Sequence, residues 1–165
     1  MYDRSDPRSA LAAARPAAPV PNSFAPPQYG RFYETAADET SEAGKSWYIR
    51  GQNFVLCYSE AAIGAVFARA AQIDEYAVIL PDAGTQARIE AGGESRDIDG
   101  NTLVFVPPGP SRITMLTAGR IVRLVTSKAA DLVARCPNAG AYGETHASIP
   151  PFEGWPEPVG GYRIR

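Results

Sequence analysis

Side chains that could do chemistry are few and widely spaced in this sequence. His146 is the single histidine of the 165 residues, and Cys57 and Cys136 are the two cysteines. Metal sites built on imidazole need more than one histidine, and zinc knuckles need cysteines in close pairs. We therefore expect no metal and no cofactor, and we expect both cysteines to be buried free thiols.

The sequence signals for other catalytic arrangements are equally weak. A histidine titrates near neutral pH, but His146 lies in a glycine- and proline-rich segment, where a surface or hydrogen-bonding role is more usual. Cys57 has no histidine near it in sequence, and Ser111 lacks the G-x-S-x-G frame of a nucleophile elbow. Gly92-Gly93 indicates a hairpin turn and no G-x-G-x-x-G precedes a helix, so no phosphate-binding loop is predicted.

The net charge and the lengths of the apolar runs exclude some classes of binding partner. The net charge is −2 at pH 7, and the basic residues are scattered, which gives no footprint for nucleic acid or for an anionic membrane. The longest apolar stretch near the N-terminus, Ala10–Ala14, is too short for a signal-peptide core or a membrane span. We expect a cytoplasmic protein that binds neither nucleic acid nor membrane.

Short runs rich in β-branched and aromatic residues make up the middle of the chain. They are Trp47–Tyr58, Ile63–Ala68, Tyr76–Leu80, Thr85–Glu90, Ser95–Ile98, Leu103–Val106, Arg112–Leu116 and Ile121–Thr126. Turn signals, among them Pro81–Gly84 and Asp99-Gly100, separate these runs at regular spacing. The pattern predicts an all-β sandwich or barrel over residues 46–127.

A Pro/Ala-rich arm and a polar loop precede the predicted barrel, over residues 1–45. The arm is too poor in large apolar residues to fold by itself, so we expect it to be either a tail or an arm that lies on a neighbouring surface. The aromatic side chains Tyr29, Phe32 and Tyr33 could anchor its end. Residues 34–45 are acidic and polar, which is typical of a loop.

Residues 128–165 follow the barrel as a short helix and a Pro/Gly-rich strap. The helix is predicted over Ser127–Arg135, with Ser127 as its N-cap and Pro137 as its stop. Tyr162–Arg165 has the composition of a strand. An end of this kind indicates either a fragment or a strand that pairs with another chain.

Two blocks of the barrel region resemble the conserved motifs of the cupins, which are small jelly-roll barrels. The stretch from Gly100 to Gly109, with its Pro-Pro-Gly, resembles the second cupin block. Asp74–Leu80 is similar to the glutamate-bearing strand of the first block. The resemblance implies an all-β, cupin-type double-stranded β-helix with an extended N-terminal arm and one short C-terminal helix.

The metal-binding histidines of the cupin motifs are missing. Counted from Glu75, two of their positions fall on Arg69 and Ala71, or on Ala68 and Ala70 with the longer spacing. The third falls on Arg112. Of the four ligands that the motifs call for, three histidines and one glutamate, the chain retains the glutamate alone, so the resemblance implies a barrel without a metal.

The resemblance also places the candidate ligand-binding residues in the barrel interior: Arg69, Glu75, Arg112 and Tyr76. Glu75 could pair with Arg69 or Arg112 in the space of the missing metal, or could act as a general acid or base. Either guanidinium could bind a carboxylate or phosphate of a small anionic molecule. Tyr76 could line the pocket or belong to the core.

Three functions remain open at this point. The first is a non-catalytic structural or assembly half-domain that pairs with another cupin barrel, as a homodimer or as the N-terminal half of a two-barrel (bicupin) protein. The second is a module that binds a small carboxylate or sugar. The third is a metal-independent cupin isomerase or lyase. We favour the first function because unpaired sheet edges are usually covered. The first function predicts a barrel interior filled by side chains. The second predicts a water-filled cavity with Arg69 and Arg112 pointing inward.

Overall fold

The computed structural model describes residues 26–144, 146 and 156–165, and the chain divides into two compact units. The larger unit comprises Gln28–Ala141 and Arg163–Arg165, and the second comprises Met1–Pro27 and Tyr142–Tyr162. Most of the predicted arm and part of the predicted strap lie outside the described residues. His146 belongs to the second unit, not to the strands.

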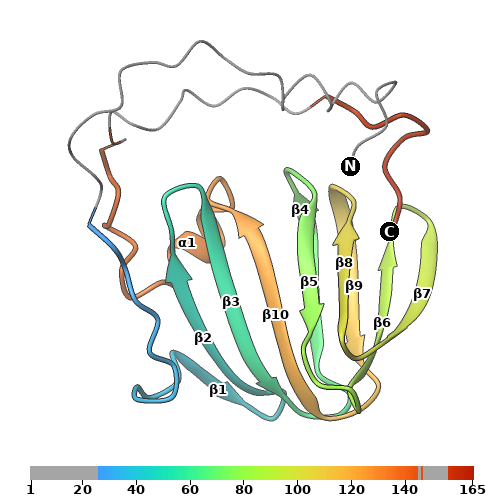
Figure 1. The fold of residues 1–165 in the computed structure, drawn as a ribbon, viewed down its shortest axis with the longest axis horizontal. Coiled ribbons are helices and arrows are strands. Elements are labelled where there is room, and N and C mark those ends of the chain that lie inside the picture. The colour runs from blue at the N-terminus through green and yellow to red at the C-terminus, as the bar shows by residue number, and fades with distance from the viewer. Residues whose placement is uncertain (1–25, 145, 147–155) are drawn as a thin grey trace. The chain divides into compact units, whose positions relative to one another are not determined.

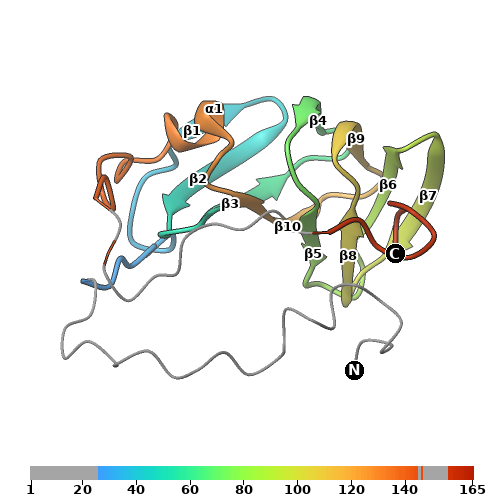
Figure 2. The same ribbon diagram turned by 90° about the horizontal axis from the view of Figure 1, so that it is seen from above.

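The larger unit consists of antiparallel strands and one short helix (Figures 1 and 2). Its elements are β1 (Glu39–Ser41), β2 (Gly44–Arg50), β3 (Phe54–Ala61), β4 (Val66–Gln72), β5 (Tyr76–Leu80), β6 (Gln86–Ala91), β7 (Glu94–Asp99), β8 (Thr102–Val106), β9 (Gly109–Met115), β10 (Gly119–Thr126) and α1 (Ala130–Val133). One sheet has the order β1-β2-β3-β10-β5-β8 and the other the order β4-β9-β6-β7. The all-β prediction is confirmed.

Side chains alternate between core and solvent along the strands, as the pleat requires. In β6, Ala87, Ile89 and Ala91 are buried and the residues between them are exposed. The inner faces of both sheets meet in one hydrophobic core. Because a shift of one residue would turn a strand's apolar side chains outward, the register between strands decides which residues reach the interior.

The predicted loop over 34–45 is wrong in its second half. It contains β1 and the start of β2, which pair antiparallel with Glu39 opposite Ser46. All three residues of β1 are exposed, so no alternation of apolar residues marks the strand. The single run Trp47–Tyr58 is two strands, because a turn follows Arg50 in which the Gly51 N–H donates to the Phe54 carbonyl over 2.8 Å.

Helix α1 is shorter than the predicted Ser127–Arg135, and Ser127 does not cap it. Ala129 occupies the N-cap position and makes no side-chain capping hydrogen bond. The N–H of Ser127 donates instead to the Asn53 carbonyl over 3.0 Å, which extends the pairing of β3 with β10 by one residue. Pairing with the sheet therefore delays the start of the helix.

Phe32 is the one of the three predicted aromatic anchors that is packed. Its ring stacks on Tyr58 with centroids 5.5 Å apart and lies 6.3 Å from the Trp47 ring. Tyr29 and Tyr33 are exposed. One large apolar side chain thus fixes the segment before β1 to the outer face of β2 and β3.

The end of the chain pairs with the edge strand β8 of the same molecule. The Phe105 N–H donates to the Arg165 carbonyl over 2.7 Å, and the Arg165 N–H donates to the Phe105 carbonyl over 3.2 Å. Ile164 is buried in the core. The strand predicted over Tyr162–Arg165 is not formed, but Arg165 pairs with a strand of its own barrel.

Candidate functional site

A β-bulge turns two polar side chains of β4 into the barrel. Arg69 lies opposite Ser111 of β9 and Gln72 lies opposite Gly109, so β4 has one residue more than its partner in this stretch. As a result Arg69 and Gln72 lie on the same side, and Arg69 Nε donates to Gln72 Oε1 over 3.0 Å. The strand predicted over Ile63–Ala68 ended before this bulge, whereas β4 runs to Gln72.

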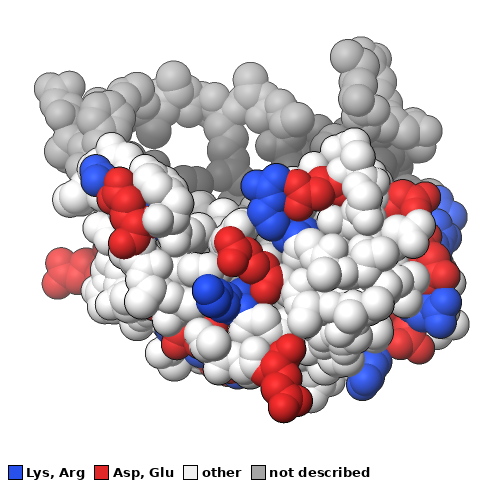
Figure 3. All heavy atoms as spheres, turned by 90° about the horizontal axis from the view of Figure 1, so that it is seen from below, with Lys and Arg blue, Asp and Glu red and all other residues white. Residues whose placement is uncertain are grey.

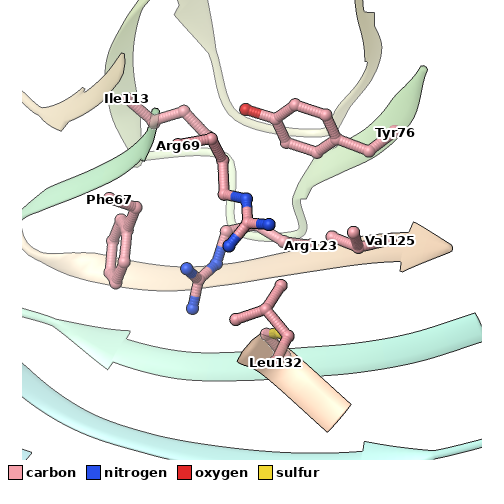
Figure 4. Close-up of a pocket in the computed structure, with 8 residues that line it drawn as sticks. Phe67, Arg69, Tyr76, Ile113, Arg123, Val125 and Leu132 are labelled. Carbon is pink, nitrogen blue, oxygen red and sulfur yellow. The ribbon is translucent and has the colours of Figure 1, made fainter. Parts of the chain in front are cut away.

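Arg123 brings a second guanidinium to the same place from β10. It lies between Ile121 and Val125, which both face the core. Its Nη2 donates to Ser59 Oγ over 3.1 Å, and its guanidinium carbon lies 4.1 Å from the centroid of the Phe67 ring. Figure 4 shows the side chains of Arg69 and Arg123 reaching into one cavity.

The cavity between these groups is very small. It is lined by Cys57, Phe67, Arg69, Tyr76, Ile113, Arg123, Val125 and Leu132 (Figure 4). Its volume is about 10 Å³, which is at the lower limit for one water molecule. This cavity, as it is in the structure, therefore has no room for a small organic molecule.

The hydroxyl of Tyr76 and the thiol of Cys57, which both line the cavity, remain protonated at neutral pH. The Tyr76 hydroxyl and Ser111 Oγ lie 2.9 Å apart in a hydrogen bond. Burial raises the pKa of Tyr76 and that of the Cys57 thiol, although Arg123 and Arg69 act in the opposite direction on Cys57. Both groups are therefore neutral at pH 7, and neither can serve there as a base or as an anionic nucleophile.

Helix α1 closes the cavity and is held by ion pairs on two sides. Leu132 is buried against the cavity, and the neighbouring Asp131 carboxylate accepts from Arg69 Nη1 at 2.5 Å and from Nη2 at 3.0 Å. The Arg69 guanidinium lowers the pKa of Asp131. Just after the helix, Arg135 pairs with Glu39 at 3.0 Å. These contacts connect α1 to one strand of each sheet.

Glu75 has a described partner that sequence reasoning did not consider. Its carboxylate forms an ion pair with Arg165 at 3.1 Å, and only 15% of the Glu75 side chain is exposed. The two residues are close because the chain end lies along β8, the neighbour of β5. Arg69, one of the two partners expected for Glu75, is paired with Asp131.

The prediction that Arg112 points into the barrel is wrong. Arg112 is exposed, while its neighbours Ser111 and Ile113 on β9 are buried. It lies opposite Ala68 and Glu90, which are exposed as well. Because side chains alternate along a strand, Ser111 and not Arg112 occupies the inward position beyond the Pro-Pro-Gly corner.

Sequence reasoning identified Arg69 and Tyr76 but missed the residues that complete the cluster: Gln72, Ser111, Arg123 and Asp131. A signal for Arg123 was present, since it stands at an inward position of the alternation Ile121-x-Arg123-x-Val125. No local signal marked Asp131 or the bulge that orients Gln72, because both depend on contacts distant in sequence.

The side chains present do not fit a divalent metal. Two guanidinium groups line the cavity, and their charge opposes a dication. Within residues 26–144, 146 and 156–165, no three histidine, cysteine or carboxylate side chains are grouped so as to hold a metal ion.

The buried thiols give a direct test of how tightly the interior is packed. The pKa of Cys136 is raised to about 11, mainly by burial and to a smaller extent by the nearby Cys57. At pH 8, therefore, roughly one Cys136 side chain in a thousand is a thiolate. We expect a disulfide reagent such as DTNB to label neither Cys136 nor Cys57 in the folded protein within minutes. Both should be labelled at once in guanidinium chloride; rapid labelling of the folded chain would contradict this packing.

The outer surface of the molecule carries no large patch of one charge on the face seen in Figure 3, where basic and acidic side chains lie next to one another. Pairs such as Arg88–Asp97 and Arg96–Glu94 account for this on the four-stranded sheet. None of the described helices is long and apolar enough to cross a membrane.

Comparison with solved structures supports the fold. The sequence matches no protein-family model and no curated protein. An RmlC-like cupin from Shewanella frigidimarina is similar in structure, with a TM-score of 0.54 and 12% identity over 64% of this chain and 96% of that chain. KdgF from Halomonas sp. gives a TM-score of 0.54 and 11% identity over 64% of this chain and 98% of that chain. The barrel described above therefore has the cupin fold, as the motifs of the sequence implied.

Proposed function

We propose that this chain is a non-catalytic assembly domain, a cupin barrel that pairs with a second copy of itself through the outward face of its six-stranded sheet. The observation that carries the proposal is the composition of that face. Outward positions of an antiparallel sheet that meets water are usually polar. On this sheet they form two apolar rows that cross five strands.

The rows follow from the pairing register. In the first row, Leu103, Ile79, Val122, Tyr58 and Trp47 are successive neighbours on β8, β5, β10, β3 and β2. In the second row, Phe105, Ala77, Leu124, Leu56 and Ile49 are neighbours in the same way. No charged residue interrupts either row.

Part of this face is exposed and part is already covered. Phe32 packs on Trp47 and Tyr58 at the β2 end. At the β8 end, 53% of Leu103 is exposed, and Phe105 and Leu124 are exposed as well. The free part, over β3, β10, β5 and β8, spans about 14 Å across three strand spacings, and its two rows lie about 7 Å apart along the strands. Such a patch suits the apolar centre of an interface with a polar rim.

A second copy of the chain fits this surface by symmetry. A two-fold interface brings the same patch of both subunits together. Neither row contains a charged residue, and the guanidinium of Arg165, which lies 5.5 Å from the centroid of the Phe105 ring, is paired with Glu75. Self-pairing therefore leaves no charge of this face buried without a partner. The other partner that could cover this face is a different cupin barrel, as in a two-barrel protein, and the experiment below distinguishes the two.

The small size of this cavity supports a role outside catalysis. A reaction on a small molecule needs room beside the acid or base, and the cavity of about 10 Å³ between Arg69 and Arg123 gives none while α1 closes it. Burial raises the pKa of both Tyr76 and Cys57, the two groups at the cavity whose deprotonated forms would be bases. The metal-independent isomerase or lyase is therefore less well supported than the assembly domain.

We expect the purified chain to be a dimer and the variant Leu124→Lys to be a monomer. Leu124 lies near the centre of the free part of the face, where a lysine would bury an unpaired charge on pairing. Light scattering coupled to gel filtration, over a range of protein concentrations, measures the mass of each.

Ile63→Lys is the matched control, since Ile63 is 70% exposed in the turn after β3 and belongs to neither row. It should remain a dimer. A monomeric wild type, or a dimer that survives Leu124→Lys with its circular dichroism unchanged, would exclude this interface. A wild-type chain that is monomeric alone but forms a 1:1 complex with a different cupin barrel would replace the homodimer with the two-barrel arrangement.

A further inference from the structure

The interior beneath α1 contains more positive charge than the described part of the chain neutralises. Arg69 and Arg123 both line the cavity. Arg69 is paired with Asp131. Among the described residues Arg123 has a hydroxyl, Ser59, and an aromatic ring, Phe67, as partners but no carboxylate. Half-buried guanidinium groups normally have an anionic partner, because moving a charge away from water is costly.

The same region also has hydrogen-bond donors in excess. Within the described residues, the buried Nε of Arg123 and the buried Nε2 of Gln72 have no acceptor. Gln72 is only 4% exposed, and its Oε1 is already used by Arg69. A buried donor without an acceptor destabilises the folded chain, because it has lost its hydrogen bond to water. A bound anion supplies the missing acceptors and the missing charge together.

Asp131 shows which anion these arginines accept. Its two carboxylate oxygens take one hydrogen bond from each terminal nitrogen of Arg69, the bidentate geometry that suits carboxylates. The two sides of this pair differ in their exposure to water: 59% of the Asp131 side chain is exposed and 15% of the Arg69 side chain. The carboxylate partner of Arg69 therefore stands at the solvent side of the pair, on a helix of four residues without a side-chain cap, where another carboxylate can compete with it.

We propose that Arg69 and Arg123 form a binding site for a small carboxylate, and that Asp131 on α1 occupies it as a removable internal ligand. The site lies within one barrel, so it does not depend on the pairing proposed above. Gln72, whose Oε1 accepts from Arg69 Nε, carries a further donor, Nε2.

The size of the cavity requires α1 to move. With Leu132 in place the space is about 10 Å³, which a carboxylate group exceeds. When Asp131 leaves Arg69, the Leu132 side chain can withdraw with the helix. The walls then left are Phe67, Ile113 and Val125, which are apolar and suit a short hydrocarbon chain behind the carboxylate.

Butyrate is the probe, and uncharged butyramide is its control of equal shape. Calorimetric titration should show that Asp131→Asn binds butyrate about three- to tenfold more tightly than the wild type, because the internal competitor is gone. Adding Arg123→Gln to Asp131→Asn should weaken binding more than about tenfold. Butyramide should bind none of these proteins.

Circular dichroism checks that each variant is folded. If Arg123→Gln is not folded, Arg123→Lys takes its place. The lysine keeps the positive charge but lacks the planar guanidinium with its paired donors, so it should still weaken butyrate binding. The proposal is overturned if folded Asp131→Asn binds butyrate no more tightly than the wild type, or if the Arg123 substitutions leave binding unchanged. Titration of Leu124→Lys separates the two proposals, since butyrate binding should persist in that variant whatever its oligomeric state.

Discussion

Replacing Gly100 by alanine is expected to lower the free energy of unfolding by about 3 kcal/mol or more. A Cβ built at this position would lie 1.8 Å from the Asp82 carbonyl oxygen and 2.6 Å from its carbon. The obstacle is backbone, which cannot turn aside as a flexible side chain does. Relief would require the turn after β5 to move away from the turn before β8.

Gly84→Ala is the matched control for Gly100→Ala. Gly84 follows the same turn of Asp82 and Ala83, but a Cβ there meets nothing within 4 Å. Its substitution should change stability little, or raise it slightly by restricting the unfolded chain. Urea denaturation followed by circular dichroism measures both variants. Equal stabilities for the two would show that these turns do not approach each other in this way.

The second large effect is expected from Ile113→Ala, with a loss of about 3 kcal/mol in the free energy of unfolding. Ile113 is 1% exposed on β9 and lines the cavity between the two arginines. Removing its side chain loses apolar burial and leaves a hole that the surrounding strands cannot close, since they are fixed by their hydrogen bonds.

Ile63→Ala makes the same chemical change at a position that is 70% exposed. Urea denaturation should place it within about 0.5 kcal/mol of the wild type. If Ile113→Ala were equally neutral, the inner face of β9 would have to be assigned differently. In that case Arg112 would regain the inward position that the sequence motif implied for it.

Much of the fold was predictable because its signals are local. Alternating and β-branched runs marked most of the strands, and β5 has the predicted bounds Tyr76–Leu80. The exceptions have two causes, one local and one distant in sequence. Strand β1 has no buried side chain to mark it, and α1 begins late because Ser127 is paired to the residue before β3.

The candidate site was predictable only in part. Arg69 and Tyr76 were identified, and the structure places both at the cavity. Glu75 was expected beside Arg69 or Arg112, but its described ion pair is with Arg165, which reaches it by lying along β8. A pairing between residues so far apart in sequence depends on the order of the strands, which no local pattern reveals.

The sequence by itself determined that this protein is an all-β barrel of the cupin type and that it lacks the histidines for a cupin metal site. Both conclusions depend on residue types and short spacings. Only the tertiary structure decided which arginines face inward. Arg112 points outward because Ser111 and Ile113 take the core positions on β9. Arg69 and Arg123 meet because a bulge and a strand crossover bring β4 and β10 to one cavity; such contacts follow from long-range register, which a sequence read along its length does not contain.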